Sequence, residues 1–386
     1  MYDGPVVDVC INHTWPNQLE LMKYMSAGWR EYLGRPNALP NGGGLISISP
    51  GNPYRRPGGI EKLPETKGPQ GELEGSSYEM LKSMLDKHRV ERAVLTFDVA
   101  AFTPALLHPY LTLDIARATN DWTIDRWLGL GDPRLASLMM VPNQLPLESA
   151  LEIRRLATHP AIVGVLLGAN GLGKTFGHPA YHPIYEAAAE FDLPLVIKSG
   201  SESVPESLTS PTGVGVPATF SEAYAFSAQP MMTHVAGMIV QGVFDKFPNL
   251  RVLLLGGGSL WVPAMMWRFD NNYRGLRRDA PWMRRLPSEY FLEHVRVGTN
   301  PLEKFPAQGQ FHRALEAMKG LRNTMCFASG YPNWDSETPD VVAEQLPESW
   351  QQKVMHDNAC ALFGFPDHAG VRADVATPSI SLESRP

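Results

Sequence analysis

The sequence has few cysteines and no long apolar run, and each scarcity excludes a class of protein. Three cysteines occur in 386 residues, at Cys10, Cys326 and Cys360, too few and too widely spaced for a disulfide framework or a paired-cysteine metal site. A reducing, cytoplasmic setting is therefore expected. No run of eighteen apolar residues is present, and residues 1–5 lack a leader pattern, so neither a membrane span nor a signal peptide is expected.

Basic runs are scarce as well. The net charge is −6 and no five basic residues are consecutive, which argues against a nucleic-acid partner. The densest basic cluster, Arg274 to Arg285, is interrupted by Asp279 and Pro281 and is interpreted as a solvated segment. A hydrophobic content of 44% can build a large core. The expected partners are a small molecule and a second copy of the chain, as a homodimer.

Short apolar segments alternate with helical patterns along the chain. The segments predicted as strands are residues 6–11, 92–97, 135–141, 162–167, 194–198, 251–255, 295–298 and 324–328. Eight strands, each followed by helix, predict a (β/α)₈ barrel of the α/β class, with two doubly wound domains as the alternative. Longer helices are predicted at residues 16–32, 108–127 and 350–363.

The domain boundaries follow from composition. No composition break divides residues 1–366, which are predicted to form one barrel domain. Residues 34–71 follow the first strand, are rich in glycine and proline, and are predicted to form an extended flap. Residues 367–386 are predicted to be a flexible tail.

One predicted strand, Pro194-Leu195-Val196-Ile197-Lys198, is apolar until it ends on a lysine. The carboxyl ends of strands are where α/β proteins place ligands and catalytic groups, so Lys198 is a candidate site residue. The alternative is a lysine that extends to solvent at the rim.

Residues 168–175, GANGLGKT, match the phosphate-binding pattern GxxxxGK[ST]. That site needs a helix beginning at the Gly-Lys-Thr. Gly177, Pro179 and Pro183 follow closely, so a glycine-rich loop is the preferred interpretation.

Several blocks of sequence resemble the amidohydrolase superfamily, and more narrowly the branch containing aminocarboxymuconate-semialdehyde decarboxylase. The resemblance covers about residues 6–365. Its blocks are VVDVCIN (6–12), HPIYEAAA (182–189), LPLVI (193–197), GVFDKFPNLRV (242–252), WVP (261–263), MWR (266–268), FASGYP (327–332), WD (334–335), NA (358–359) and LFG (362–364). The resemblance implies a distorted (β/α)₈ barrel with a divalent metal at the carboxyl ends of its strands.

The departures from the family pattern fall on the implied metal ligands. The two ligands that end the first strand are replaced by Cys10 and Asn12, and the histidine that ends the fifth by Lys198. The characteristic aspartate after the eighth strand is replaced by Gly330, and a His or Glu after the sixth by Gly256. Asparagine is a weak ligand, glycine is none and an ammonium repels cations. We therefore expect no metal and no other cofactor.

Lys198 then has three possible roles. Its charge could replace that of the metal and bind a carboxylate or stabilise an oxyanion or enolate. If desolvated, it could act as a base or form a Schiff base with a carbonyl group. It could instead be structural, pairing with Asp98 or Asp335.

Other candidates surround it. Cys10 is a nucleophile candidate or a packed small residue, Asn12 shares its strand face, and His234 is an acid or base candidate or a structural histidine. Polar and aromatic residues after other strands are candidates for substrate binding: Asp98, Asn143, Asn300, Tyr331, Asn333 and Trp334.

Three functions remain open. The first is a metal-independent enzyme of a specialised pathway such as secondary metabolism, acting on a small organic acid, carbonyl or amide by lyase, hydrolase or condensation chemistry. The second is a metal-dependent decarboxylase or hydrolase with a degenerate site. The third is a catalytically dead subunit that partners an active paralogue.

Overall fold

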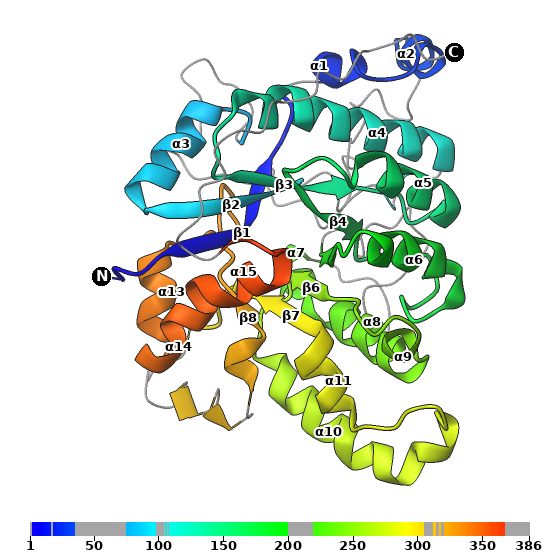
Figure 1. Cartoon of the computed structure of the whole chain (residues 1–386), viewed down its shortest axis with the longest axis vertical. Helices are drawn as coiled ribbons and strands as arrows, with labels where there is room; N and C mark the ends of the chain where they lie inside the picture. Colours follow the sequence, from blue (N-terminus) through cyan, green and yellow to red (C-terminus); the bar gives the residue numbers. More distant parts are fainter. Residues whose placement is uncertain are drawn as a thin grey trace.

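Eight parallel strands, wrapped by helices, form the centre of the molecule in the computed structural model (Figure 1). The structure describes residues 2–366 except 17, 35–74, 98–103, 105, 107, 200–218, 305–311, 314, 315, 318 and 319. The strands are β1 (Val6–His13), β2 (Val90–Phe97), β3 (Leu135–Met140), β4 (Ile162–Gly168), β5 (Leu195–Lys198), β6 (Val252–Leu255), β7 (Val295–Gly298) and β8 (Met325–Cys326). They pair in sequence order, each with the next.

The two edges of this sheet approach each other and nearly close a barrel. The Val9 amide donates to the carbonyl of Phe327 at 3.0 Å, and the Gly330 amide donates to the carbonyl of Cys10 at 3.1 Å. The predicted (β/α)₈ barrel in a single domain is therefore confirmed. The predicted flap at 34–71 lies, apart from residue 34, outside the described residues, as does the predicted tail at 367–386.

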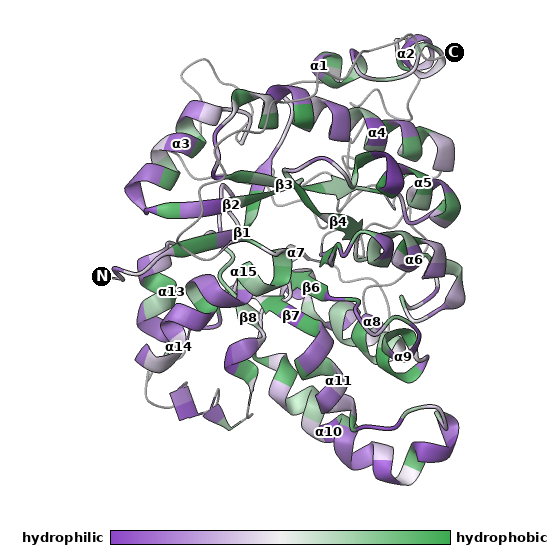
Figure 2. Cartoon of the chain, in the orientation of Figure 1, coloured by the Kyte–Doolittle hydropathy of each residue, from purple (hydrophilic) through white to green (hydrophobic). Residues whose placement is uncertain are grey.

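The strands are apolar because both faces are covered, as parallel barrels require. All residues of β5 and β6 are buried, and Figure 2 shows the strands as predominantly hydrophobic while the outer helices carry hydrophilic faces. β1 is buried along its whole length although it contains Asp8, Asn12 and His13. Such buried polar side chains need hydrogen-bond partners.

Helices cover the outside of the barrel. Those after the first strands are α1 (Gln18–Met22), α2 (Ala27–Leu33), α3 (Tyr78–Lys87), α4 (Pro109–Arg126), α5 (Pro146–Leu156) and α6 (His182–Glu190). Those that follow are α7 (Phe220–Ala225), α8 (Ala228–Val240), α9 (Val243–Lys246), α10 (Trp261–Leu276), α11 (Pro287–His294), α13 (Pro339–Gln345), α14 (Glu348–Gln352) and α15 (Asn358–Phe363). Among the described residues, no helix combines the length and apolarity needed to cross a bilayer.

Two of the three helix predictions are confirmed with small changes. The helix at 108–127 is α4, and the one at 350–363 is α14 and α15, joined through a π-helical turn at Lys353–Asp357. The single helix predicted at 16–32 is wrong, because the chain turns between α1 and α2. The Ser26 amide donates to the carboxylate of Asp114 on α4 at 3.1 Å, so a tertiary contact fixes that turn.

The glycine-rich segment 168–175 is not a phosphate-binding loop of the nucleotide-binding type. The helix α6 begins only at His182, so no helix starts at Lys174. The interpretation of this segment as a loop after β4 is confirmed.

Candidate active site

Lys198 ends β5 at the edge of the barrel toward which all eight strands run. It lies in register with Gly168 of β4 and Leu255 of β6, so it is flanked by backbone on both sides. Only 6% of the residue is exposed. This burial argues against a lysine that extends to solvent at the rim and places a cation inside the carboxyl end of the barrel, where barrel enzymes build their active sites.

Asn12 and Thr96 hold the ammonium group of Lys198. The Lys198 Nζ donates to Asn12 Oδ1 and lies 3.5 Å from Thr96 Oγ1. Thr96 Oγ1 also donates to Asn12 Oδ1 at 2.8 Å, and Asn12 Nδ2 donates to the carbonyl of Gly330 at 3.0 Å. That last bond fixes the amide so that its oxygen faces the ammonium. We call Lys198, Asn12 and Thr96 the lysine cluster; they come from β5, β1 and β2.

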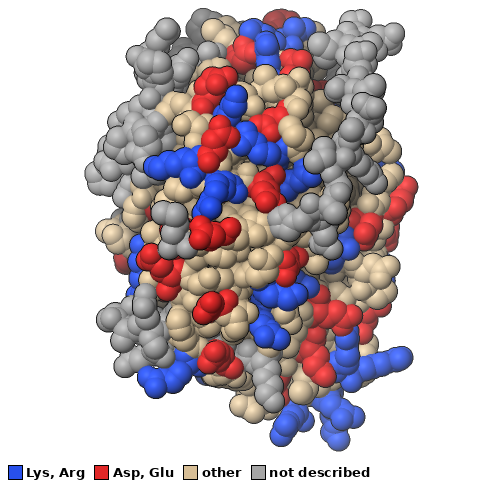
Figure 3. All heavy atoms as spheres, turned by 60° about the vertical axis from the view of Figure 1, so that its left-hand side comes forward, with Lys and Arg blue, Asp and Glu red and all other residues tan. Residues whose placement is uncertain are grey.

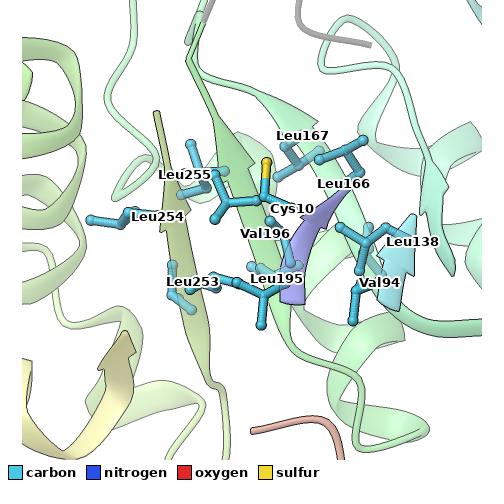
Figure 4. Close-up of a cluster of buried hydrophobic side chains, with 14 of the residues drawn as sticks. Cys10, Val94, Leu138, Leu166, Leu167, Leu195, Val196, Leu253, Leu254 and Leu255 are labelled. Carbon is cyan, nitrogen blue, oxygen red and sulfur yellow. The ribbon is translucent and has the colours of Figure 1, made fainter. Parts of the chain in front are cut away.

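Cys10 lies one inward position below Asn12 on β1. Its Sγ is 3.9 Å from Thr96 Oγ1. Figure 4 shows the sulfur among the aliphatic side chains of Leu166, Val196 and Leu255. The structure brings Cys10 next to the lysine cluster, and these apolar neighbours are typical of a packed small residue.

Asp8 is buried on the same face of β1 as Cys10 and Asn12. Its Oδ1 accepts the backbone amides of Cys10 and Ser329, each at 3.0 Å, and so ties β1 to the chain after β8. Its Oδ2 is buried without a hydrogen-bond partner among the described residues. Burial raises the pKa of this carboxyl to about 6, against the lowering effect of those hydrogen bonds.

Two glycines occupy positions where the family resemblance implies a ligand, and the space around each is filled. Gly330 has φ +72°, and a Cβ placed there would lie 2.9 Å from side-chain atoms of Asn300. Gly256 has φ +84°, and a Cβ there would lie 2.1 Å from Ser199 Oγ. Positive φ disfavours residues with a side chain, so the backbone at both positions suits glycine.

His234 lies within α8 and bonds to the loop that follows β4. Its Nε2 contacts the carbonyl of Ala169 at 2.6 Å, and its Nδ1 accepts the amide of Phe176 at 3.2 Å. Its ring stacks on Phe176 with centroids 4.1 Å apart. Burial lowers the pKa of His234 to about 4, so the ring is neutral near pH 7. These contacts fit a histidine that fixes the loop after β4, and none of them joins it to Lys198.

The asparagines predicted to bind substrate make backbone contacts. Asn143 Nδ2 donates to the carbonyls of Gly168 and Asn170 at 2.7 and 2.8 Å, joining the loops after β3 and β4. Asn300 Nδ2 donates to the carbonyl of Asp335 at 2.9 Å. Both therefore shape the loops at the carboxyl end of the barrel. Asp98 lies outside the described residues.

The loop after β8 brings the remaining candidates to the same end. The backbone amide of Asn12 donates to the carbonyl of Tyr331 at 2.6 Å, and the backbone amide of Asn333 donates to the carbonyl of Gly330 at 2.9 Å. Trp334 packs on Tyr224, with ring centroids 5.3 Å apart, and is 36% exposed. The Asp335 carboxylate accepts the Tyr224 hydroxyl at 2.7 Å.

Neither Thr96 nor Asp8 was predicted from the sequence to have a role in the site. The signal for Thr96 was present, since alternation along β2 places Thr96 on the same face as Val94, toward the barrel interior. The role of Asp8 depends on a contact 321 residues away in the sequence, which no local pattern predicts.

The fold and the position of the lysine cluster define the class: a (β/α)₈ barrel with a polar site at the carboxyl ends of its strands. The chain belongs to the amidohydrolase family, whose model matches residues 70–365. It is 27% identical over 295 residues to gamma-resorcylate decarboxylase of Rhodococcus jostii, covering 72% of this chain and 85% of that protein. It is also 27% identical over 169 residues to 2-amino-3-carboxymuconate-6-semialdehyde decarboxylase of Dictyostelium discoideum, covering 43% of each. The branch indicated by the sequence blocks is thus confirmed.

Solved structures agree on the fold. An amidohydrolase from Mycobacterium avium subsp. paratuberculosis superposes with a TM-score of 0.70 at 16% identity, covering 95% of this chain and 100% of that one. A dihydroxybenzoic acid decarboxylase from Polaromonas, solved with bound manganese, has a TM-score of 0.57 at 19% identity, covering 75% of this chain and 87% of that one.

The residues at the implied ligand positions do not fit such a cation. A thiol, an ammonium, an amide and two glycines stand there. The ammonium is bonded to the amide oxygen that could otherwise face a metal, the glycines have no donor side chain, and the Cys10 thiol alone does not make a metal site. Within the described ranges, no group of three or more His, Cys, Asp or Glu side chains could hold a metal ion.

Proposed function

We propose that this chain is a carbon–carbon lyase of the decarboxylase type that acts on a small carboxylic acid, with Lys198 as the positive charge at its reacting centre. The observation that carries the proposal is the 6%-exposed ammonium held by Asn12 at the carboxyl end of the barrel. The reaction type is supported by the relatives, of which gamma-resorcylate decarboxylase is one.

The chemistry needs a cation at this place. When the bond between the carboxyl group and its carbon breaks, CO₂ leaves and the electron pair stays on the substrate, where a proton later replaces the carboxyl group. A fixed ammonium stabilises that developing enolate or phenolate, and more strongly inside a barrel than in water. The Lys198 Nζ already donates to Asn12 Oδ1, and this contact supports an electrostatic role over a Schiff base.

The comparisons favour a second candidate, a metal-dependent decarboxylase with a degenerate site. The dihydroxybenzoic acid decarboxylase from Polaromonas was solved with manganese, and the comparisons give no support to metal independence. Support for the lysine as the positive charge comes instead from the side chains at the site. Lys198 stands where the family resemblance implies a metal-binding histidine, and Gly330 and Gly256 have no side-chain donor atoms.

Substitution of Lys198 tests the proposal. The full chain is assayed for CO₂ release from hydroxylated aromatic acids, beginning with 2,6-dihydroxybenzoate, the ligand of a solved relative. Lys198→Met removes the charge and keeps most of the length of the side chain, so kcat falls by about a thousandfold. Lys82→Met, on the exposed face of α3, is the matched control and keeps full turnover.

The outcomes separate the candidates. Equal turnover in Lys198→Met and the native chain contradicts the proposal. Turnover that requires added manganese and survives Lys198→Met supports the degenerate metal site. Borohydride inactivation that depends on a carbonyl substrate would show a Schiff base instead of an electrostatic role.

A further inference from the structure

A second concave site lies at the connection between α10 and α11, which extend from the barrel at the lower end of Figure 1. The hollow there has a volume of about 620 Å³. Four arginines line it: Arg277, Arg278, Arg284 and Arg285. In Figure 3, Lys and Arg side chains gather at this end of the molecule. The segment interpreted from sequence as merely solvated is folded around a basic hollow.

Most of this positive charge is not neutralised. Arg277, Arg278 and Arg284 form no ion pair with any residue that the structure describes. Arg285 pairs with Glu293 and stacks over the ring of Tyr290, 4.4 Å from its centroid.

The acidic residues nearby do not balance the arginines. Glu289 also lines the hollow, but its carboxylate accepts the Leu286 amide at 2.7 Å and so caps the start of α11. Among the described residues, no other acidic residue lines the hollow; Asp245, Asp270 and Glu293 lie outside its lining and bond to Tyr290, Ser288 and Arg285. The hollow therefore carries a net positive charge, although the chain as a whole carries −6.

Packing fixes the shape of the hollow. The Tyr273 hydroxyl donates to the carbonyl of Met283 at 2.9 Å, and the Arg284 amide donates to the Tyr290 hydroxyl at 3.3 Å. The Trp282 indole donates to the carbonyl of Val240 at 2.9 Å, which ties the segment to α8. The arginines are thus presented from a connection with its own tertiary contacts.

We propose that this hollow binds a small organic polyanion carrying at least two phosphate or carboxylate groups. Guanidinium groups bind both kinds of oxyanion with paired hydrogen bonds. The volume falls within the roughly 300–1,000 Å³ range of small-molecule sites, whereas a macromolecular partner would need a broader surface. Pro281 and Met283 supply apolar wall for the uncharged part of the ligand.

Calorimetric titration of the full chain tests the site with defined probes. ADP, pyrophosphate and citrate are titrated at low salt and at about 150 mM salt, with adenosine as the uncharged comparison. At least one polyanion binds, its affinity falls as salt rises, and adenosine does not bind. Tighter binding of ADP and pyrophosphate than of citrate identifies phosphate as the preferred group; the reverse identifies carboxylate.

Arginine variants locate the binding. The double variant Arg277→Gln, Arg278→Gln weakens binding by about tenfold for each arginine removed. Arg268→Gln, exposed on α10 and outside the hollow, is the matched control and changes affinity less than twofold. Lys198→Met leaves binding unchanged, which separates this site from the barrel. No binding of any probe at millimolar concentration, or equal losses in Arg268→Gln and the double variant, overturns the proposal.

Discussion

Asp8 on β1 and His234 on α8 are buried ionisable residues, and burial moves their pKa values in opposite directions. The carboxyl of Asp8 is raised to about 6 and the imidazole of His234 is lowered to about 4. In each case desolvation disfavours the charged form of the side chain. A pKa that differs between folded and unfolded chain makes the free energy of unfolding depend on pH.

For Asp8 the folded-state pKa lies above the ordinary value of 3.8, so the folded chain binds the proton more tightly. The associated stability is present below about pH 4 and is lost as pH rises through about 6. Asp8→Asn cannot titrate and keeps an oxygen to accept from Ser329. Urea unfolding between about pH 4 and pH 7 should show the native chain losing about 3 kcal/mol relative to this variant as pH rises. A constant difference across that range would contradict the assignment.

For His234 the folded-state pKa lies below the ordinary value of 6.5, so the unfolded chain binds the proton more tightly. Its stabilising contribution is present above about pH 6.5 and is lost as pH falls toward 4. His234→Gln removes that titration while retaining a donor and an acceptor for the loop. The native chain should lose about 3 kcal/mol relative to His234→Gln on acidification, in the same unfolding series. A difference with the opposite slope would show that His234 is charged in the fold.

At the scale of the elements, the backbone of the loop after β8 determines which residue fits at position 330, beside the end of β1. Gly330 has φ +72° and packs beside Asn300. Its carbonyl accepts the side-chain amide of Asn12 and so turns the Asn12 oxygen toward Lys198. Where the family resemblance implies an aspartate, this chain thus has a backbone conformation and a neighbour that leave no room for one.

Gly330→Asp restores the residue that the family resemblance implies, and we expect it to destabilise the fold without creating a metal site. The strained φ and the displaced Asn300 should together cost about 2–4 kcal/mol in chemical denaturation. Gly364→Asp is the matched control, because Gly364 has φ +68° with no atom within 4 Å of a Cβ, and it should cost only about 1 kcal/mol. Equal costs, or stoichiometric manganese binding by Gly330→Asp in calorimetry, would show that the site accepts the aspartate.

The elements themselves could largely be predicted, because runs such as those ending in Lys198 and Leu255 are apolar and short. The break between α1 and α2 could not, since it depends on Asp114 of a distant helix. Within the site, too, the contacts between residues distant in the sequence could not be predicted. Strand alternation placed Cys10 and Asn12 on one face, but the bond from Lys198 to Asn12 joins residues 186 positions apart. Local patterns carry no information on such contacts.

At the scale of the whole molecule, the family and the barrel follow from sequence blocks spread along the chain, and both are confirmed. The basic hollow beside α10 was not predicted, because composition shows only that the cluster is interrupted by Asp279 and Pro281. Folding brings the arginines on both sides of that interruption around one cavity. The molecule thus has a buried cation inside the barrel and a group of exposed cations outside it.

The central claim is the proposal that Lys198, and not a bound metal ion, supplies the positive charge at the reacting centre; the Polaromonas decarboxylase was solved with bound manganese. The most direct test is the metal content of the full chain, purified from manganese-supplemented medium, measured by mass spectrometry on the same sample whose turnover is assayed. The account predicts well under one transition-metal ion per chain and turnover that a chelator does not change. One tightly bound metal per chain, whose removal abolishes turnover and whose return restores it, would contradict it.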